Sequence, residues 1–192
     1  MYYIKCMKYI VRYLAIITLI TTFWAGPAAA RQDDPRLNDL FTELSETENL
    51  QKGKVIEQSI WGIWLESGSD TVDFLMVQGM SYMGQGALGK ALTIFTSIIK
   101  IDPEYSEGWN KRATVLFLMG EFSASVEDIG RTLELEPRHF GALAGLGQIY
   151  DRLDSSNGAR SAFEKAVKIN PHMATVKERL KQLQKEIDDK KI

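Results

Sequence analysis

Cysteine is nearly absent from this chain, which contains one, Cys6, and histidine is rare, with His139 and His172 the only two. A single cysteine excludes a disulfide framework and leaves no thiol chemistry beyond position 6. Two histidines without cysteine, and without an acidic partner four residues away, make a poor zinc site. We therefore predict no metal site and expect both histidines to pack or to lie at the surface.

The chain also has no excess of positive charge and none of the common catalytic motifs. Its formal net charge is −2, which is unlike the basic footprint of a nucleic-acid-binding protein. No G-x-S-x-G, P-loop or dinucleotide fingerprint occurs in the sequence, and the numerous carboxylates fall on polar helix faces. These absences argue against an enzyme, a cofactor and a nucleic-acid partner, and they leave an unrecognised hydrolase or metal-dependent enzyme as the remote alternative.

Long apolar runs are confined to the first thirty residues. All their charges are basic (Lys5, Lys8 and Arg12), an apolar run spans 13–25, and Ala28-Ala29-Ala30 follows a Gly-Pro break. This order is typical of a signal peptide over 1–30, and the apolar stretch is shorter than the roughly 20 residues of a membrane-spanning helix. We expect cleavage after Ala30 and a periplasmic or secreted protein of net charge about −5. An uncleaved leader that anchors the chain in the inner membrane is the alternative, and translation from Met7 is a second possible start.

A repeat dominates the rest of the sequence. Pro103, Pro137 and Pro171 are spaced by 34 residues, and small and aromatic residues recur at the same spacing. Each unit has apolar residues at three- and four-residue intervals on both sides of a turn-rich gap, which predicts two amphipathic helices.

The recurring residues have separate tasks within each unit. We expect the small residues at 79, 113 and 147 where two helices cross closely, with large aromatic residues filling the wedge between them. We expect each recurring proline at the first position of the next helix, where its missing N–H would be unpaired in any case. Asp102 or Asn170 would then serve as the N-cap.

This pattern resembles the tetratricopeptide repeat, W-x2-L-G-x2-Y, then A-x3-F, then P over 34 residues. The third unit matches it best, the first nearly as well, and the middle unit departs most. The matching residues of the third unit are Leu143, Leu146, Gly147, Tyr150, Ala159, Phe163, Ala166 and Pro171. The resemblance implies an all-α fold: a right-handed α-solenoid of antiparallel helix pairs.

The domain plan follows from the register of the repeats. We predict a flexible polar segment over 31–35, an atypical N-terminal helix pair over 36–69, three repeats over 70–171 and a C-terminal capping helix over 172–192. Terminal units of such arrays are atypical because they close the open ends of the stack, and we expect that role of the N-terminal pair. A dimerising coiled coil is the alternative for the last helix, and the sequence leaves the oligomeric state open.

Tetratricopeptide solenoids of this kind present the first helix of each pair on a concave surface where peptides or partner helices dock, and the resemblance implies the same here. Residues at i, i+3, i+7 and i+10 leave each first helix on the side not used for packing. Apart from Asp73, Glu107 and Asp151, which share these faces, the predicted partner-binding residues are Met76, Met80, Met83, Asn110, Thr114, Phe117, Gly141, Ala144 and Gln148.

The chemistry of this set favours a protein or peptide ligand. The methionines and Phe117 would form a pliable apolar wall, the glycine and alanine a low floor, and the amide and hydroxyl groups would pair with a ligand backbone. The alternative is that the methionines and glycine only pack against neighbouring units. Met76 and Met80 stand where chaperone-binding members of the family hold a C-terminal carboxylate, so that activity is not supported.

Two further pairs of residues lie outside this set. Lys111 and Arg112 favour solvated or inter-unit charges over an anion site. Trp61 and Trp64 lie in a run so apolar that we expect core packing, with a second binding surface as the alternative.

Overall fold

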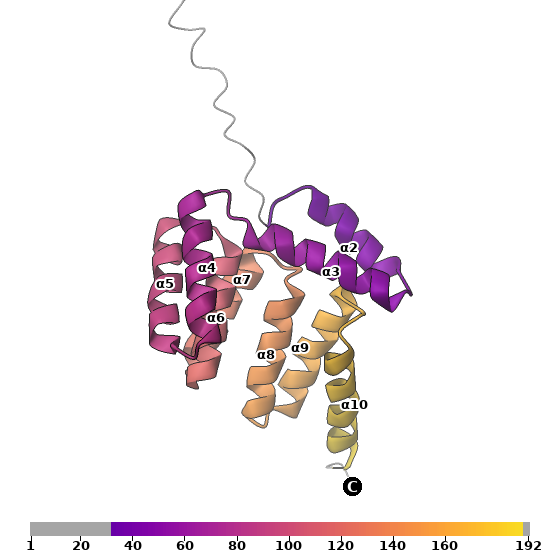
Figure 1. Cartoon of the computed structure of the whole chain (residues 1–192). Coiled ribbons are helices and arrows are strands. Elements are labelled where there is room, and N and C mark those ends of the chain that lie inside the picture. Colours follow the sequence, from indigo (N-terminus) through magenta and orange to yellow (C-terminus); the bar gives the residue numbers. More distant parts are fainter. Residues whose placement is uncertain (1–31, 190–192) are drawn as a thin grey trace, which may run out of the picture.

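The computed structural model describes residues 32–189, so the predicted signal peptide over 1–30 lies outside the described residues. The described residues form nine helices and no strand, which confirms the all-α solenoid (Figure 1). None of the helices in 32–189 has both the length and the apolarity to cross a membrane. In chain order the helices are α2 (Arg36–Glu46), α3 (Leu50–Leu65), α4 (Asp70–Gly84), α5 (Leu88–Ile101), α6 (Ser106–Met119), α7 (Phe122–Leu135), α8 (Phe140–Arg152), α9 (Ser156–Ile169) and α10 (Ala174–Asp189).

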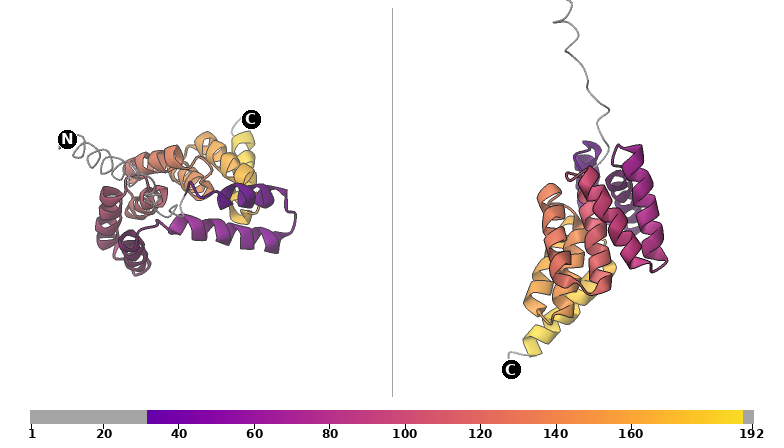
Figure 2. Two further views of the ribbon diagram at one scale, coloured as in Figure 1. Left: turned by 90° about the horizontal axis from the view of Figure 1, so that it is seen from above. Right: turned by 90° about the vertical axis from the view of Figure 1, so that its left-hand side faces the viewer.

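Three antiparallel pairs, α4–α5, α6–α7 and α8–α9, form the repeats. They stack in chain order because α5 packs on α6 and α7 packs on α8. Seen from above, the pairs form an arc (Figure 2). The last helix, α10, covers the end of this arc by packing on α9 with Val176 and Leu183 buried.

The first and third units cross their helices at a glycine, as the sequence predicts. A Cβ atom at Gly79 would lie 2.6 Å from the ring of Phe95, and one at Gly147 would overlap the ring of Phe163. Both phenylalanines are buried. The helix backbones can approach this closely only because no side chain stands at the crossing point.

Polar contacts hold the two helices of the middle unit together. Ser125 Oγ on α7 donates a hydrogen bond of 2.8 Å to the carbonyl oxygen of Ala113 on α6. Arg112 donates two hydrogen bonds of 2.7 Å to the buried carboxylate of Asp128. The unit that departs most from the repeat pattern therefore replaces part of the apolar wedge by a bidentate ion pair.

The expected role of the recurring prolines as first helical residues is wrong. Helices α6, α8 and α10 begin at Ser106, Phe140 and Ala174, three residues beyond each proline, and the prolines lie in turns. The residue before each proline caps the turn instead of the helix. Asp102, Glu136 and Asn170 accept hydrogen bonds of 3.1, 2.9 and 2.9 Å from the backbone N–H two residues onward, as acidic and amide side chains do in tight turns.

The N-terminal pair, α2 and α3, has a different place from the one expected. It does not close the first end of the stack. Instead, α3 packs against α6 and α2 against α9, so that the pair crosses the edge of the arc where the first helices of the units begin (Figures 1 and 2). The buried face of this pair is too apolar to remain in solvent, and it packs against the turns between the units rather than against α4.

Residues at one position of the 34-residue repeat make many of the contacts with the N-terminal pair. Tyr105, His139 and Met173 each stand two residues after a recurring proline. Tyr105 Oη donates a hydrogen bond of 2.9 Å to the carbonyl oxygen of Trp64, the His139 ring stacks on Trp64, and Met173 packs against the apolar cluster of the N-terminal pair. The pair therefore contacts the turns that follow all three units.

Candidate functional site

A small hollow opens between the first helices of the middle and third units, and we call it the groove. Its volume is about 70 Å³, well below the roughly 300 Å³ of small-molecule sites, so it suits the tip of a side chain. Five of the nine predicted partner-binding residues line it: Asn110, Thr114, Phe117, Gly141 and Gln148. Thr114 and Gln148 are exposed, whereas Asn110 is buried.

The other four predicted residues lie outside the groove lining. Met76 is 1% exposed and belongs to the core of the first unit, against which Met80 and Met83 are half-buried. Ala144 is 6% exposed and packs in the core of the third unit. The apolar wall expected from three methionines is therefore not part of this groove.

Helix α3 reaches the groove residue Gly141 with Trp61. A Cβ atom at Gly141 would lie 2.6 Å from the Trp61 ring, so glycine is required for the indole to reach the groove floor. The ammonium of Lys111 lies 5.2 Å from the centre of the same ring, within the range of a cation–π interaction.

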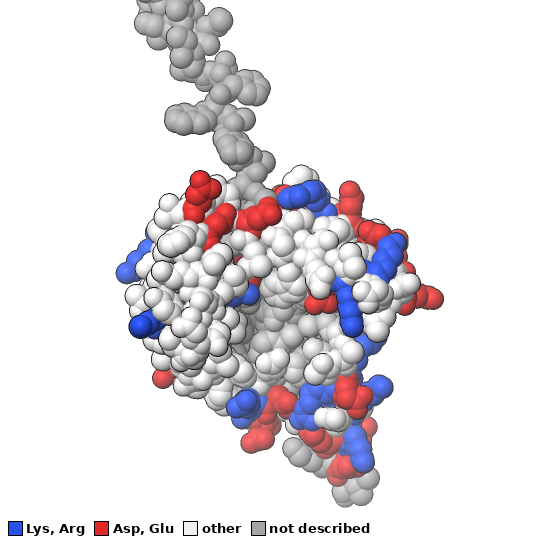
Figure 3. All heavy atoms as spheres, in the orientation of Figure 1, with Lys and Arg blue, Asp and Glu red and all other residues white. Residues whose placement is uncertain are grey.

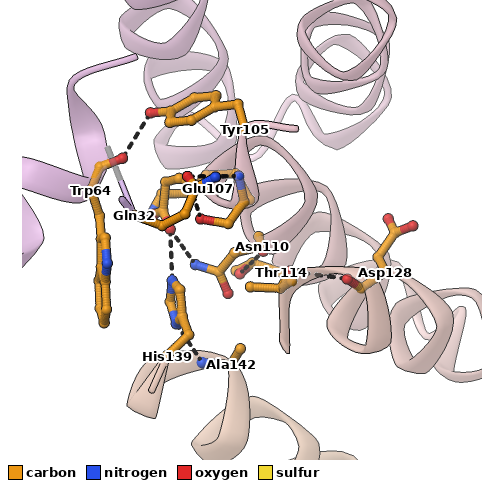
Figure 4. A network of polar contacts seen from close by, with 12 residues as sticks. Gln32, Trp64, Tyr105, Glu107, Asn110, Thr114, Asp128, His139 and Ala142 are labelled. Carbon is orange, nitrogen blue, oxygen red and sulfur yellow. Dashed lines mark hydrogen bonds and ion pairs between the residues drawn. The ribbon is translucent and has the colours of Figure 1, made fainter. Parts of the chain in front are cut away.

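A buried polar network beside the groove centres on Glu107 (Figure 4). Glu107 Oε2 accepts hydrogen bonds of 2.9 Å from Asn110 Nδ2 and from His139 Nε2, and Lys111 Nζ lies 2.7 Å from Oε1. Because His139 Nδ1 accepts from the N–H of Ala142 at 3.0 Å, its proton stands on Nε2 and the ring is neutral. His139 is thus a structural histidine, which agrees with the expectation from sequence.

The charge of Glu107 orients Asn110 for the groove. Burial opposes ionisation of Glu107, but Lys111 and the hydrogen bond from His139 outweigh it, so that the pKa of this carboxyl is lowered. The ionised carboxylate holds the Nδ2 group of Asn110. Among the described residues none donates to Asn110 Oδ1, and Asn110 is one of the residues that line the groove.

Comparison with known proteins decides the family. The family model of the tetratricopeptide repeat matches residues 140–173. A TPR repeat-containing protein of Rhizobium etli is 33% identical over 155 residues, which cover 81% of this chain and 76% of the relative. This chain is a tetratricopeptide-repeat protein.

Solved tetratricopeptide-repeat structures share its fold. The first TPR domain of Spaghetti (RPAP3), bound to an HSP90 peptide, superimposes with a TM-score of 0.58 at 19% identity and covers 61% of this chain and 93% of that one. The Yersinia enterocolitica type III secretion chaperone SycD, in complex with a peptide of the translocator YopD, gives 0.59 at 15% identity, with 65% and 97% covered. At these identities the likeness establishes the fold.

The concave side of this tetratricopeptide-repeat chain is nearly neutral. The acidic residues that share the concave faces are all engaged internally: Asp73 accepts from the N–H of Ser67 at 2.8 Å, Glu107 binds His139, and Asp151 binds Arg179. Figure 3 shows the surface hollowed between α4 and α8, with mostly uncharged atoms inside and charged groups at the rim. One rim charge, Arg152, lies 5.5 Å from the centre of the Phe117 ring.

Two features of the described residues bear on catalysis. Within residues 32–189 no cluster of three or more His, Cys, Asp or Glu could hold a metal ion. Glu107, whose carboxyl pKa is lowered, is sealed from solvent, whereas a catalytic carboxyl must reach its substrate. Asn110, Thr114 and Gln148 are the predicted polar residues that line the groove.

Sequence reasoning missed the part that the N-terminal pair plays at this site. Trp61 and Trp64 were expected in a core, and Trp64 is buried, but nothing in the sequence alone placed Trp61 against the groove. The signal that could have found it is the 34-residue recurrence of Tyr105, His139 and Met173. Large side chains at one turn position of every unit indicate a shared neighbour.

Proposed function

We propose that this chain is an exported scaffold that binds a segment of a partner protein in the groove between α6 and α8. The observation that carries the proposal is the groove itself, where Asn110, Thr114, Phe117, Gly141 and Gln148 converge on one small neutral hollow. A hollow of this size accepts one side chain, while the surrounding amide and hydroxyl groups bind the backbone that bears it.

The groove chemistry favours an uncharged ligand segment with a small or apolar side chain at its centre. Phe117 and the glycine floor offer apolar contact, and Asn110 Oδ1 is held ready to accept an N–H because its amide nitrogen is fixed by Glu107. A preorganised acceptor costs less conformational entropy on binding than a free one. A ligand carboxylate would find no basic side chain among the groove lining.

The fold neighbours support a peptide ligand. The RPAP3 domain is bound to an HSP90 peptide and SycD is in complex with a YopD peptide. Binding of a protein segment is therefore an established use of this architecture, and the same use is proposed for this chain.

The proposed location is the periplasm, with the leader over 1–30 removed after Ala30. The support is the order of basic residues, apolar run and small residues in the sequence. A membrane-tethered assembly factor for an envelope complex, with the leader retained, is the second candidate. Amino-terminal sequencing of the protein isolated from its cells separates the two, because a chain that begins near Arg31 excludes the tether.

In-cell photocrosslinking tests the groove. A photoreactive residue at Thr114, which is exposed in the groove, is expected to capture a discrete partner protein, and Thr93, an exposed threonine on α5, is the matched control. The captured protein is identified, and a synthetic peptide of the crosslinked segment is then titrated against the purified chain. Asn110→Asp should weaken binding of that peptide at least about tenfold, because it removes the amide donor that Glu107 holds and adds a second carboxylate to a neutral hollow.

Capture at both positions, or at neither, would contradict the groove as the binding site. So would a peptide affinity that Asn110→Asp leaves unchanged while circular dichroism shows the variant folded.

A further inference from the structure

The outer face of α4 is the most exposed apolar surface among the described helices. Phe74 is 66% exposed and Val77 is 64% exposed. The residues 34 and 68 positions after Phe74 are Gly108 and Ala142, both buried, and those after Ser81, on the same face, are Val115 and Ile149, both fully buried. The counterparts of Val77 are Lys111 and Gly145, both half-buried. The first unit thus exposes a face that the later units cover.

The cover in the later units is the second helix of the preceding unit, α5 on α6 and α7 on α8. The first unit has no preceding unit. The N-terminal pair, the one segment of 32–189 that could have filled this place, crosses the turn edge and packs against α6 and α9. The stack therefore ends at α4 with a helix-binding face that the described chain leaves open.

We propose that a second copy of this chain covers this face, with α4 packed antiparallel on its counterpart. The exposed stripe of α4 recurs at i, i+4, i+7, i+11 and i+14, and consists of Asp70, Phe74, Val77, Ser81 and Gly84. Its two large apolar side chains, Phe74 and Val77, precede its two smallest residues, Ser81 and Gly84. An antiparallel pair with its two-fold axis at the level of Gly79 places Phe74 on Gly84 and Val77 on Ser81 in both directions, as a symmetric interface requires.

Charge also favours this arrangement over its rivals. A parallel pair would bring Asp70 against Asp70, whereas the antiparallel pair separates the two carboxylates by the length of the helix. Stacking the C-terminal end of one copy on α4 of another would set α10 against Phe74. The exposed face of α10 carries Glu178, Lys181 and Lys185, whose desolvation would oppose that contact.

The size of the contact predicts a reversible dimer. Helix α4 has 15 residues and is about 22 Å long, so one helix pair buries less than the roughly 800 Å² per partner of a standard interface. We expect dissociation constants of tens of micromolar, in the range of transient complexes. The proposal is independent of the groove, because α4 contributes no residue to its lining.

Sedimentation velocity of the full chain over about 1 to 500 µM tests the proposal. The unmodified chain is expected to shift from monomer to dimer, and Phe74→Glu/Val77→Glu to weaken the dimer more than about tenfold. Val55→Glu is the matched control, because Val55 is 53% exposed on α3 and should leave the dimer unchanged. Circular dichroism confirms that the variants are folded, which is expected because all three side chains are exposed.

Disulfide trapping tests the orientation in a Cys6→Ser background, where the introduced thiols are the only ones. Mixing Val77→Cys with Ser81→Cys chains should give a mixed disulfide, and mixing Val77→Cys with Lys165→Cys, on the exposed side of α9, should not. A chain that stays monomeric throughout the range, a dimer that survives Phe74→Glu/Val77→Glu, or faster self-linking of Val77→Cys would each overturn the proposal.

Discussion

The middle unit, α6–α7, and the third unit, α8–α9, hold their two helices together by different chemistry. In the third unit a ring, Phe163, packs directly on the backbone of Gly147. In the middle unit Arg112 and Asp128 form a bidentate ion pair, and Ser125 is bonded to the backbone of Ala113. The positions equivalent to Arg112 and Asp128 in the third unit are Leu146 and Ala162.

This difference coincides with the position of the groove. The third unit matches the family pattern because that pattern describes apolar helix packing. The middle unit departs from the pattern and also holds Glu107, whose buried charge fixes Asn110 in the groove. Departures from local rules are expected where function or a special contact requires them, and here they gather in one of the two units that form the groove.

The largest loss of stability is expected from a substitution that disrupts the third unit. Gly147→Leu puts a side chain where the Phe163 ring now lies, so the two helices must separate. We expect a loss of about 3 kcal/mol or more in the free energy of unfolding, the upper range for overpacking. Urea denaturation followed by circular dichroism measures it.

Gly130→Leu is the matched control, because no atom lies within 4 Å of a Cβ built at this position of α7. It should be neutral or slightly stabilising, since glycine is about 1 kcal/mol less favourable than alanine inside a helix. Equal losses in both variants would show that the crossing point at Gly147 is misplaced.

A smaller effect is expected from breaking the ion pair of the middle unit. Asp128→Ala leaves Arg112 without its partner in a mostly buried site, where the Asp128 side chain is 5% and the Arg112 side chain 21% exposed. We expect a loss of about 2 to 3 kcal/mol in the free energy of unfolding, below the full cost of a fully buried charge because Arg112 reaches solvent.

The double variant Arg112→Leu/Asp128→Ala gives the middle unit the residues that the third unit has at these two positions. It therefore tests whether the two units pack in the same way. It should recover most of the lost stability, because replacing both members of a buried pair by apolar residues is often neutral or stabilising. A double variant as unstable as Asp128→Ala would mean that the two units do not share the packing geometry that their register implies.

The repeat register was sufficient to predict the helices and their crossing points. The spacing of Pro103, Pro137 and Pro171 fixed the unit length, and Gly79 and Gly147 lie at the close approaches as expected. The place of the N-terminal pair could not be predicted, because it depends on contacts between residues far apart in sequence. The hydrogen bond from Asn170 to Glu57 and the stacking of Trp64 on His139 are examples that local patterns do not encode.

The groove was predictable only in part, for a geometric reason. Helical periodicity assigns a residue to a face, but the position of the neighbouring helix decides which edge of that face is covered. Met76, Asn110 and Ala144 share one register position and are all buried, whereas Thr114 and Gln148, four residues further along their helices, are exposed. Only Asn110 of the buried set lines the groove.

The smallest expected effect is a difference between the two units in how their carboxylates make stability depend on pH. The pKa of Glu107 is lowered from its ordinary 4.5 because, although burial raises it, Lys111 and His139 lower it more. The folded chain therefore binds this proton less readily than the unfolded chain, so the stabilisation is complete above pH 4.5 and is lost as the pH falls through the lowered pKa.

The pKa of Asp151 in the third unit is also lowered, owing to Arg179, but the Asp151 side chain is 27% exposed. The melting temperature measured from pH 7 to pH 3 should consequently fall less steeply in Glu107→Gln than in the unmodified chain, and Asp151→Asn should flatten the profile less than Glu107→Gln does. A profile that Glu107→Gln leaves as steep as before would mean that Glu107 is not the buried carboxylate on which the middle unit depends.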